Sequence, residues 1–130
     1  MPIQTRLIRD GRVLLNTYTE PLDIGDVSDM VDQNNEEFFD KALKPLHTID
    51  DVTLIKDLPP NLLSDARPII PKRHAMAGRG YIVARAGLLS IVARTLLKVI
   101  GKEDLQVSYS LEEALGQLDE VLKQEAGNAI

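Results

Sequence analysis

Two adjacent carboxylates, Asp50 and Asp51, are the side chains of this sequence best suited to chemistry by type and spacing. They follow the apolar run Leu46 to Ile49, so we expect them at the end of a β-strand. A carboxylate pair in such a place could serve acid–base chemistry or hold a magnesium ion. No histidine, lysine or nucleophile is placed to assist them, and adjacent acids are also typical of turns. We favour the turn, with ligand binding by Asp50 and Asp51 as the alternative.

A second candidate is the turn 84–87, which joins a predicted strand to a predicted helix. In open α/β sheets, ligands bind beyond the carboxyl ends of the strands, where helix N-termini offer free N–H groups to anions. Arg85, Gly87 and Ser90 would then line a small anion site. The simpler interpretation is that Gly87 only permits a tight turn. The nearby Gly78-Arg79-Gly80 lacks the third glycine of a dinucleotide fingerprint and precedes a strand, so it predicts a turn with positive φ.

The remaining reactive side chains do not form a known catalytic or metal-binding set. His47 and His74 are the only two histidines and cysteine is absent, so zinc would lack ligands. His74 continues the basic run Lys72-Arg73, which we expect to be solvated at the end of a helix. We therefore predict no metal, no cofactor and no catalytic residue, and hence no enzyme.

Charge is distributed in blocks along the 130 residues, whose net charge is −5. Residues 20–65 hold twelve acidic and three basic side chains, residues 66–102 hold eight basic and no acidic ones, and seven acids follow with one lysine. Such blocks either select a partner through complementary potentials or neutralise one another on the folded surface. Tyr81 is the only aromatic residue of the basic block, so base stacking is not supported and we expect no nucleic-acid partner.

The composition, 44% hydrophobic and 27% charged, is typical of a single globular domain. Residues 1–15 lack the apolar stretch of a signal peptide. The most apolar segment, 87–101, is interrupted by Arg94 and Lys98 and is too short to cross a bilayer. We expect no integral membrane segment and, because cysteine is absent, a cytoplasmic location.

The N-terminal part predicts a β-hairpin and a long helix. Thr5 to Arg9 and Val13 to Thr19 are β-compatible runs around the turn dipeptide Asp10-Gly11. Asp23 is a suitable N-cap for a helix from Ile24 to Leu43. Its apolar stripe comprises Val27, Met30, Val31 and Phe38.

The rest of the chain predicts alternating strands and helices. Strands are expected at 46–49, 81–84 and 105–109, and helices at 61–67 and 69–76 (on either side of Pro68) and at 88–100. Ser110 to Glu113 is a capping box for the last helix, whose buried face comprises Leu111, Ala114, Leu115, Leu118 and Leu122. The predicted fold is α/β: a single mixed, mostly parallel sheet with an N-terminal β-hairpin and about four helices. It forms one domain over residues 1–123, followed by a frayed tail, 124–130.

This order, which ends in Val107-Ser108-Tyr109-Ser110-Leu111-Glu112-Glu113-Ala114-Leu115, resembles that of STAS-like domains. These form the sulphate-transporter and anti-sigma-factor-antagonist superfamily, and the similarity is closest to its small stand-alone bacterial branch, which also resembles lipid-binding Sec14-type domains. The resemblance implies a regulatory protein-interaction module, often switched by phosphorylation of a serine after the third strand. The family's Asp-Ser-Ser-Gly switch motif is absent, so Thr53 and Ser64 are the only candidate hydroxyls in the corresponding stretch.

The sequence leaves two functions open. The leading one is a module that docks a protein partner or a second copy of itself, with Arg94 and Lys98 emerging on one face of an otherwise apolar helix. The alternative is a carrier or sensor of a small or apolar, lipid-like ligand held between the sheet and helix 88–100. A cavity lined by Leu88, Ile91 and Val92 would favour the carrier, and an exposed apolar patch would favour docking.

Overall fold

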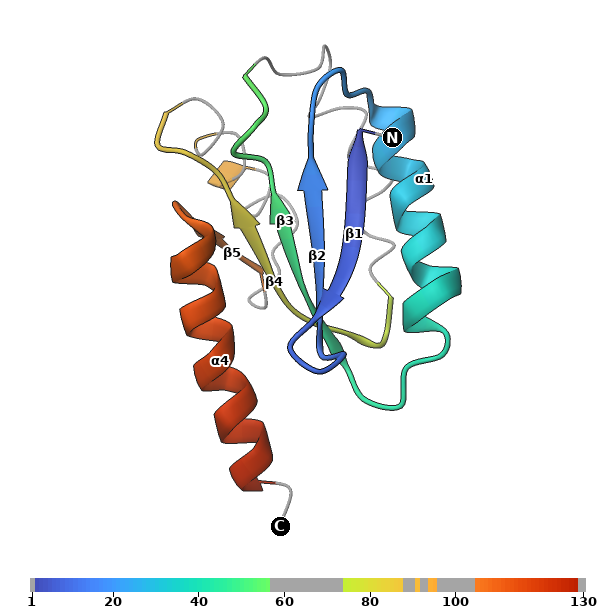
Figure 1. Cartoon of the computed structure of the whole chain (residues 1–130), viewed down its shortest axis with the longest axis vertical. Helices are drawn as coiled ribbons and strands as arrows, with labels where there is room; N and C mark the ends of the chain where they lie inside the picture. Colours follow the sequence, from blue (N-terminus) through green and yellow to red (C-terminus); the bar gives the residue numbers. More distant parts are fainter. Residues whose placement is uncertain (1, 57–73, 88–90, 92–93, 96–104, 129–130) are drawn as a thin grey trace.

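A five-stranded mixed sheet with the order β1-β2-β3-β4-β5 lies at the centre of the molecule (Figure 1). The computed structural model describes residues 2–56, 74–87, 91, 94–95 and 105–128. Its strands are β1 (Ile3–Ile8), β2 (Val13–Tyr18), β3 (Leu46–Asp51), β4 (Ala77–Val83) and β5 (Leu105–Ser108). β1 pairs with β2 in antiparallel orientation, and every later pair is parallel. The predicted α/β class, with a hairpin leading into a mostly parallel sheet, is confirmed.

The hairpin turn is longer than the two residues predicted at Asp10-Gly11. Four residues, 9–12, connect the strands, and the Arg12 N–H donates to the Arg9 carbonyl at 3.2 Å. Arg9, Asp10 and Gly11 all have positive φ. The longer loop carries two arginines to the C-terminal helix, where Arg9 pairs with Asp119 and Arg12 with Glu125, each at 2.7 Å.

The first helix begins where it was predicted but ends early. Helix α1 (Ile24–Asn34) is capped by a reciprocal box in which the Asp23 carboxylate accepts from the Asp26 N–H and the Asp26 carboxylate accepts from the Asp23 N–H. A π-helix, η1 (Asn35–Phe39), follows in place of a regular continuation to Leu43. The wider turn separates Phe38 from the apolar stripe of α1. Phe38 packs with Phe39 against the sheet, whereas Val27, Met30 and Val31 belong to a different hydrophobic cluster.

Helix α4 (Leu111–Asn128) confirms the predicted buried face and the Ser110 half of the predicted capping box. The Ser110 hydroxyl accepts from the Glu113 N–H at 3.1 Å. Ala114 and Leu118 are fully buried, with Leu111, Leu115 and Leu122 packed around them. The segment from Gln124 onward was predicted to fray, but it stays helical to Asn128, because Glu125 is tied to the sheet by Arg12 and His47.

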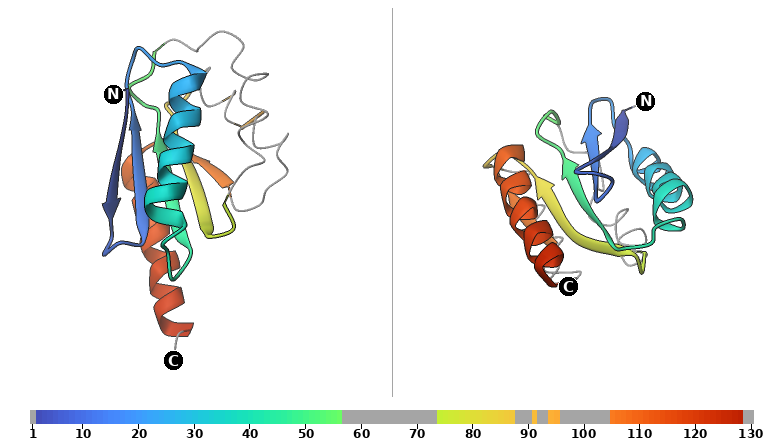
Figure 2. Two further views of the ribbon diagram at one scale, coloured as in Figure 1. Left: turned by 90° about the vertical axis from the view of Figure 1, so that its right-hand side faces the viewer. Right: turned by 60° about the horizontal axis from the view of Figure 1, so that its bottom comes forward.

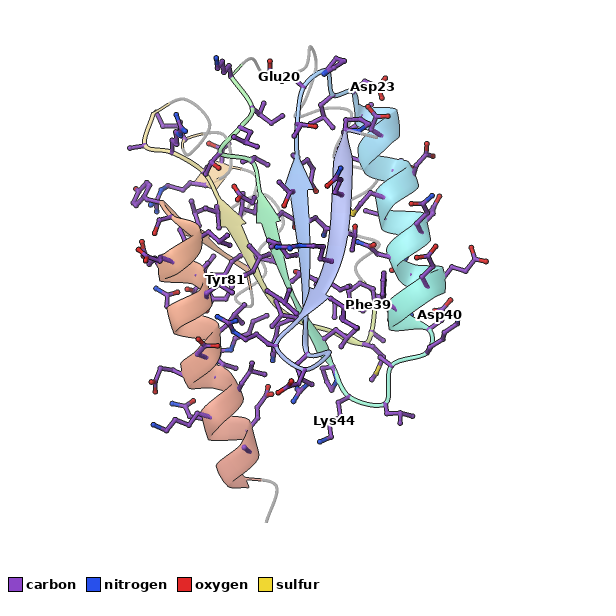
Figure 3. The ribbon with its side chains drawn as sticks, in the orientation of Figure 1. Glu20, Asp23, Phe39, Asp40, Lys44 and Tyr81 are labelled. Atoms are coloured by element: carbon purple, nitrogen blue, oxygen red, sulfur yellow. The ribbon has the colours of Figure 1, made fainter. Side chains whose placement is uncertain are left out.

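The two helices α1 and α4 cover opposite faces of the sheet (Figure 2), because side chains alternate along each strand. On β2, Val13 and Leu15 point toward α4, while Leu14 and Tyr18 point toward α1 and η1. Tyr81 accordingly lies under α4, and Phe39 lies between η1 and the sheet (Figure 3). Full burial of each such side chain contributes about 1.5–3 kcal/mol.

Strands β3 and β4 are both longer than predicted. β3 extends through Asp50 and Asp51, which therefore lie in the sheet and not in a turn after it. β4 begins at Ala77, so Gly78 and Gly80 belong to a strand; neither has positive φ, and the predicted turn at Gly78-Arg79-Gly80 is wrong. The space that Gly78 leaves is occupied by the ring of His47, since a Cβ there would lie 2.6 Å from Nδ1.

The other predicted helices fall largely outside the described residues. The predicted helix 61–67 lies wholly outside the described residues, and of the predicted helix 69–76 only His74 to Met76 are described. These three residues form a turn, in which the Ala77 N–H donates to the His74 carbonyl at 3.0 Å. Of 88–100, only Ile91, Arg94 and Thr95 are described, and all three are helical. The described residues thus contain two α-helices, α1 and α4, of the four predicted.

Candidate functional site

Asp50 is the acceptor of a buried polar network on the α1 face of the sheet. Its Oδ1 accepts from the Asn16 side-chain amide at 3.0 Å and from the Tyr18 hydroxyl at 2.9 Å. Register explains the first contact, because Asn16 on β2 is the direct neighbour of Asp50 on β3. Burial, and then the Asp50 carboxylate, raise the pKa of the Tyr18 phenol well above its ordinary value, so Tyr18 stays a donor.

The network continues from Asn16 to β1 and α1. The Asn16 amide oxygen accepts from the Thr5 hydroxyl at 2.6 Å and from the Asn34 amide at 3.0 Å. Asn16 is 2% exposed and Asn34 is also buried. A satisfied chain of this kind fixes the register of β1, β2 and β3 and the position of α1, so the structural role of Asp50 is evident from its contacts.

Asp51 points to the other face of the sheet and makes a local turn. Its Oδ1 accepts from the Thr53 N–H at 3.0 Å and from the Thr53 hydroxyl at 2.7 Å. Successive residues of a strand project to opposite faces, so Asp50 and Asp51 do not converge on one ion. Within the described ranges, no three His, Asp or Glu side chains lie close enough to hold a metal ion.

The two phosphorylation candidates differ in what the structure describes. The Thr53 hydroxyl is half-buried and already donates to Asp51, and a phosphate there would face that carboxylate at close range. Ser64 lies outside the described residues.

At the next strand end, Arg85 and Gly87 are both exposed. Gly87 has φ +130°, and its carbonyl accepts from the N–H of Ile91, the next described residue, at 3.1 Å. This agrees with the tight-turn interpretation. Ser90, the third residue of the proposed anion site, lies outside the described residues.

Replacing Gly87 with alanine is expected to cost about 1–3 kcal/mol of unfolding free energy, because its backbone conformation is unfavourable for residues with a Cβ. Gly116 is the matched control: it lies within α4, and a Cβ at either glycine would meet nothing within 4 Å. Gly116→Ala should stabilise the protein by about 1 kcal/mol. Urea unfolding of the three proteins checks the opposite signs, and equal effects would mean that the Gly87 turn imposes no strain.

Arg94 lies against an aromatic ring that sequence reasoning did not single out. Its guanidinium sits 5.3 Å from the centre of the Tyr109 ring, and it also donates to the Tyr109 hydroxyl. Ile91, one turn before Arg94, is 61% exposed and Tyr109 is 48% exposed. Lys98, the predicted companion of Arg94, lies outside the described residues.

Four of these residues gather at the carboxyl edge of β4 and β5. Tyr109 follows β5 and Arg85 follows β4 by two residues, and the strands are joined there by the Ala84 N–H donating to the Ser108 carbonyl at 2.9 Å. We call this set the carboxyl-edge surface: Arg85, Ile91, Arg94 and Tyr109. It combines two cations with two exposed apolar groups. A single tyrosine after a strand carries no distinctive sequence signal, which is why Tyr109 was missed.

Both histidines have their ring nitrogens engaged. His47, 3% exposed, accepts the Arg79 N–H at Nδ1 (2.9 Å), so its Nε2–H donates to the Glu125 carboxylate (3.0 Å). His74 accepts the Met76 N–H at Nδ1 (2.9 Å), and its Nε2 lies 2.8 Å from the Asp40 carboxylate.

The protonation of His47 is expected to make the protein less stable as the pH decreases. Burial lowers its pKa, outweighing the opposite effect of Glu125, and Arg12 and Arg79 lower it further. The unfolded chain, with a histidine pKa near 6.5, therefore takes up the proton first, and folding free energy is lost as pH falls below about 6.5 toward the folded pKa.

Urea unfolding between about pH 7.5 and pH 5 tests this linkage. The stability advantage of wild type over His47→Gln should shrink as pH falls, because the variant lacks the titrating ring. Arg9→Gln removes a different contact with α4, made by the hairpin loop, and its profile should run parallel to that of wild type. Parallel profiles for His47→Gln as well would show that His47 is not held neutral.

Comparison with known proteins gives no further assignment: no protein-family model and no curated protein matches the chain. In the described part of the chain, α1 and α4 are both unsuited to cross a lipid bilayer by length and apolar character.

Proposed function

We propose that the protein is a cytoplasmic, non-catalytic regulatory module of the STAS-like type that acts by docking a protein partner. The observation that carries this proposal is the carboxyl-edge surface, where Ile91 and Tyr109 are exposed beside Arg85 and Arg94. Aromatic residues and arginine are enriched at protein interfaces, and a cation resting on a tyrosine ring presents both in one place.

A non-catalytic role is supported by the occupied histidines and carboxylates. A general base must offer a free lone pair to a substrate proton. The Nδ1 atoms of His47 and His74 each accept a backbone N–H, and Asp50 accepts two side-chain donors. These groups serve the fold.

The order of elements supports the STAS-like type. A hairpin leads into parallel strands that follow one another in sequence across the sheet, and α1 and α4 lie on opposite faces. The proposal depends on the docking surface and not on phosphorylation. Of the three residues expected to line a ligand cavity, Leu88 and Val92 lie outside the described residues. Ile91 is exposed, so it gives the carrier alternative no support.

Affinity purification from the host with four forms of the protein tests the proposal. Wild type and Gln117→Glu, a control on an exposed position of α4, should retain the same partner, while Arg94→Glu and Tyr109→Ala should lose it. Identical retained proteins for all four forms, with unchanged circular dichroism, would contradict docking at this surface.

A further inference from the structure

We infer that the carboxyl-edge surface of one copy docks on the acidic face of α1 and η1 of a second copy. This inference rests on the proposed docking function and names the partner. The acidic face consists of five exposed carboxylates on α1, on η1 and at the residue that follows η1: Asp29, Asp32, Glu36, Glu37 and Asp40.

The acidic face is unfavourable for the isolated chain. Asp29 and Asp32 are exposed like charges three residues apart within α1, which destabilises a helix. Acids toward the C-terminal end also oppose the helix dipole, and the last turns of α1 and η1 contain no basic residue. His74 pairs with Asp40 at one end. External cations along this face would relieve the repulsion.

The carboxyl-edge surface has the complementary composition. Arg85 and Arg94 are exposed cations, and the Tyr109 ring holds the Arg94 guanidinium in place. Ile91 supplies an apolar contact, for which Leu43, 97% exposed just beyond the acidic face, is the counterpart. One surface is therefore cationic and the other anionic, and each has an exposed apolar side chain within it or beside it.

The two surfaces cannot meet within one copy. α1 packs on one face of the sheet at its β1 side, whereas β5 forms the opposite edge (Figure 1). The contact is therefore between two copies, and each copy contributes a different surface to it. Repeated contacts of this kind build a ring or an open chain, unless two of them close a symmetric dimer.

Sedimentation velocity with charge-reversed variants tests the pairing. Wild type should associate at about 50 mM NaCl and dissociate toward monomer at about 500 mM, because screening weakens contacts between exposed charges. Arg94→Glu and Glu36→Arg should each weaken association about tenfold or more through repulsion. The double variant, with both charges exchanged, should recover association. Lys123→Glu, a reversal at an exposed cation of α4 outside both surfaces, should behave as wild type.

Circular dichroism and thermal unfolding confirm that each variant is folded before its association is compared. A monomeric wild type at low salt and high protein concentration would overturn self-docking while leaving the partner-docking function to its own purification test. A double variant that stays monomeric, although both single variants have lost association, would also overturn the pairing. It would mean that Arg94 of one copy does not contact Glu36 of the other.

Discussion

Gly78→Ala is expected to lower the free energy of unfolding by about 2–4 kcal/mol, although it adds only one methyl group. That methyl carbon would lie 2.6 Å from His47 Nδ1 and 3.4 Å from the Leu46 carbonyl oxygen. The ring cannot withdraw freely, because it would lose the Arg79 N–H at one nitrogen and Glu125 at the other. The loss follows from space and not from φ, since Gly78 has no positive φ.

A double-mutant cycle with His47→Ala checks the cause. If the ring is the obstacle, Gly78→Ala should cost much less in the His47→Ala background, and chemical denaturation should show a coupling energy above about 1 kcal/mol. Additive costs would mean that the Leu46 backbone, and not the ring, excludes a side chain at this position.

Asp50→Ala should have the second large effect, a loss of about 2–4 kcal/mol, because it leaves the Asn16 amide and the Tyr18 hydroxyl buried without their acceptor. Asp51→Ala is the matched control from the adjacent residue: it removes only a local turn around Thr53 and should cost less than about 1 kcal/mol. Denaturant midpoints of the two variants give the comparison. Equal losses would contradict the assignment of Asp50 to a buried network.

The fold could be predicted where one short segment contains the whole signal. The spacing of Leu111, Ala114, Leu115, Leu118 and Leu122 repeats at the helical period, and its Ser110 cap is local, so the buried face of α4 was predicted correctly. The Asp10-Gly11 turn signal likewise identified the hairpin, though not its four-residue loop.

Features that depend on distant partners could not be predicted in this way. Gly78 has two possible reasons to be glycine, positive φ or lack of space, and the deciding ring of His47 lies 31 positions earlier on another strand. The role of Asp50 depends on the register that places Asn16 beside it. The tail remains helical because Glu125 reaches Arg12 and His47, a contact over more than 75 positions.

The candidate site residues also could be predicted where the signal is local, and could not where it depends on a distant segment of the chain. The sequence correctly marked Gly87 as a special turn and Arg94 as an exposed cation, because a strand-to-helix glycine and a charge on an apolar helix are local patterns. It gave no indication of the Tyr109 ring beneath Arg94, because that contact joins separate segments of the chain.

Native mass spectrometry of the purified protein, in volatile salt at low ionic strength, tests most directly whether this is a docking module and not a ligand carrier. The carboxyl-edge surface and the acidic face predict masses at whole-number multiples of the bare chain, which shift to the monomer in Arg94→Glu. A monomer that retains a stoichiometric small molecule, with the same added mass on the bare chain in wild type and in Arg94→Glu, would contradict docking as the function of this surface.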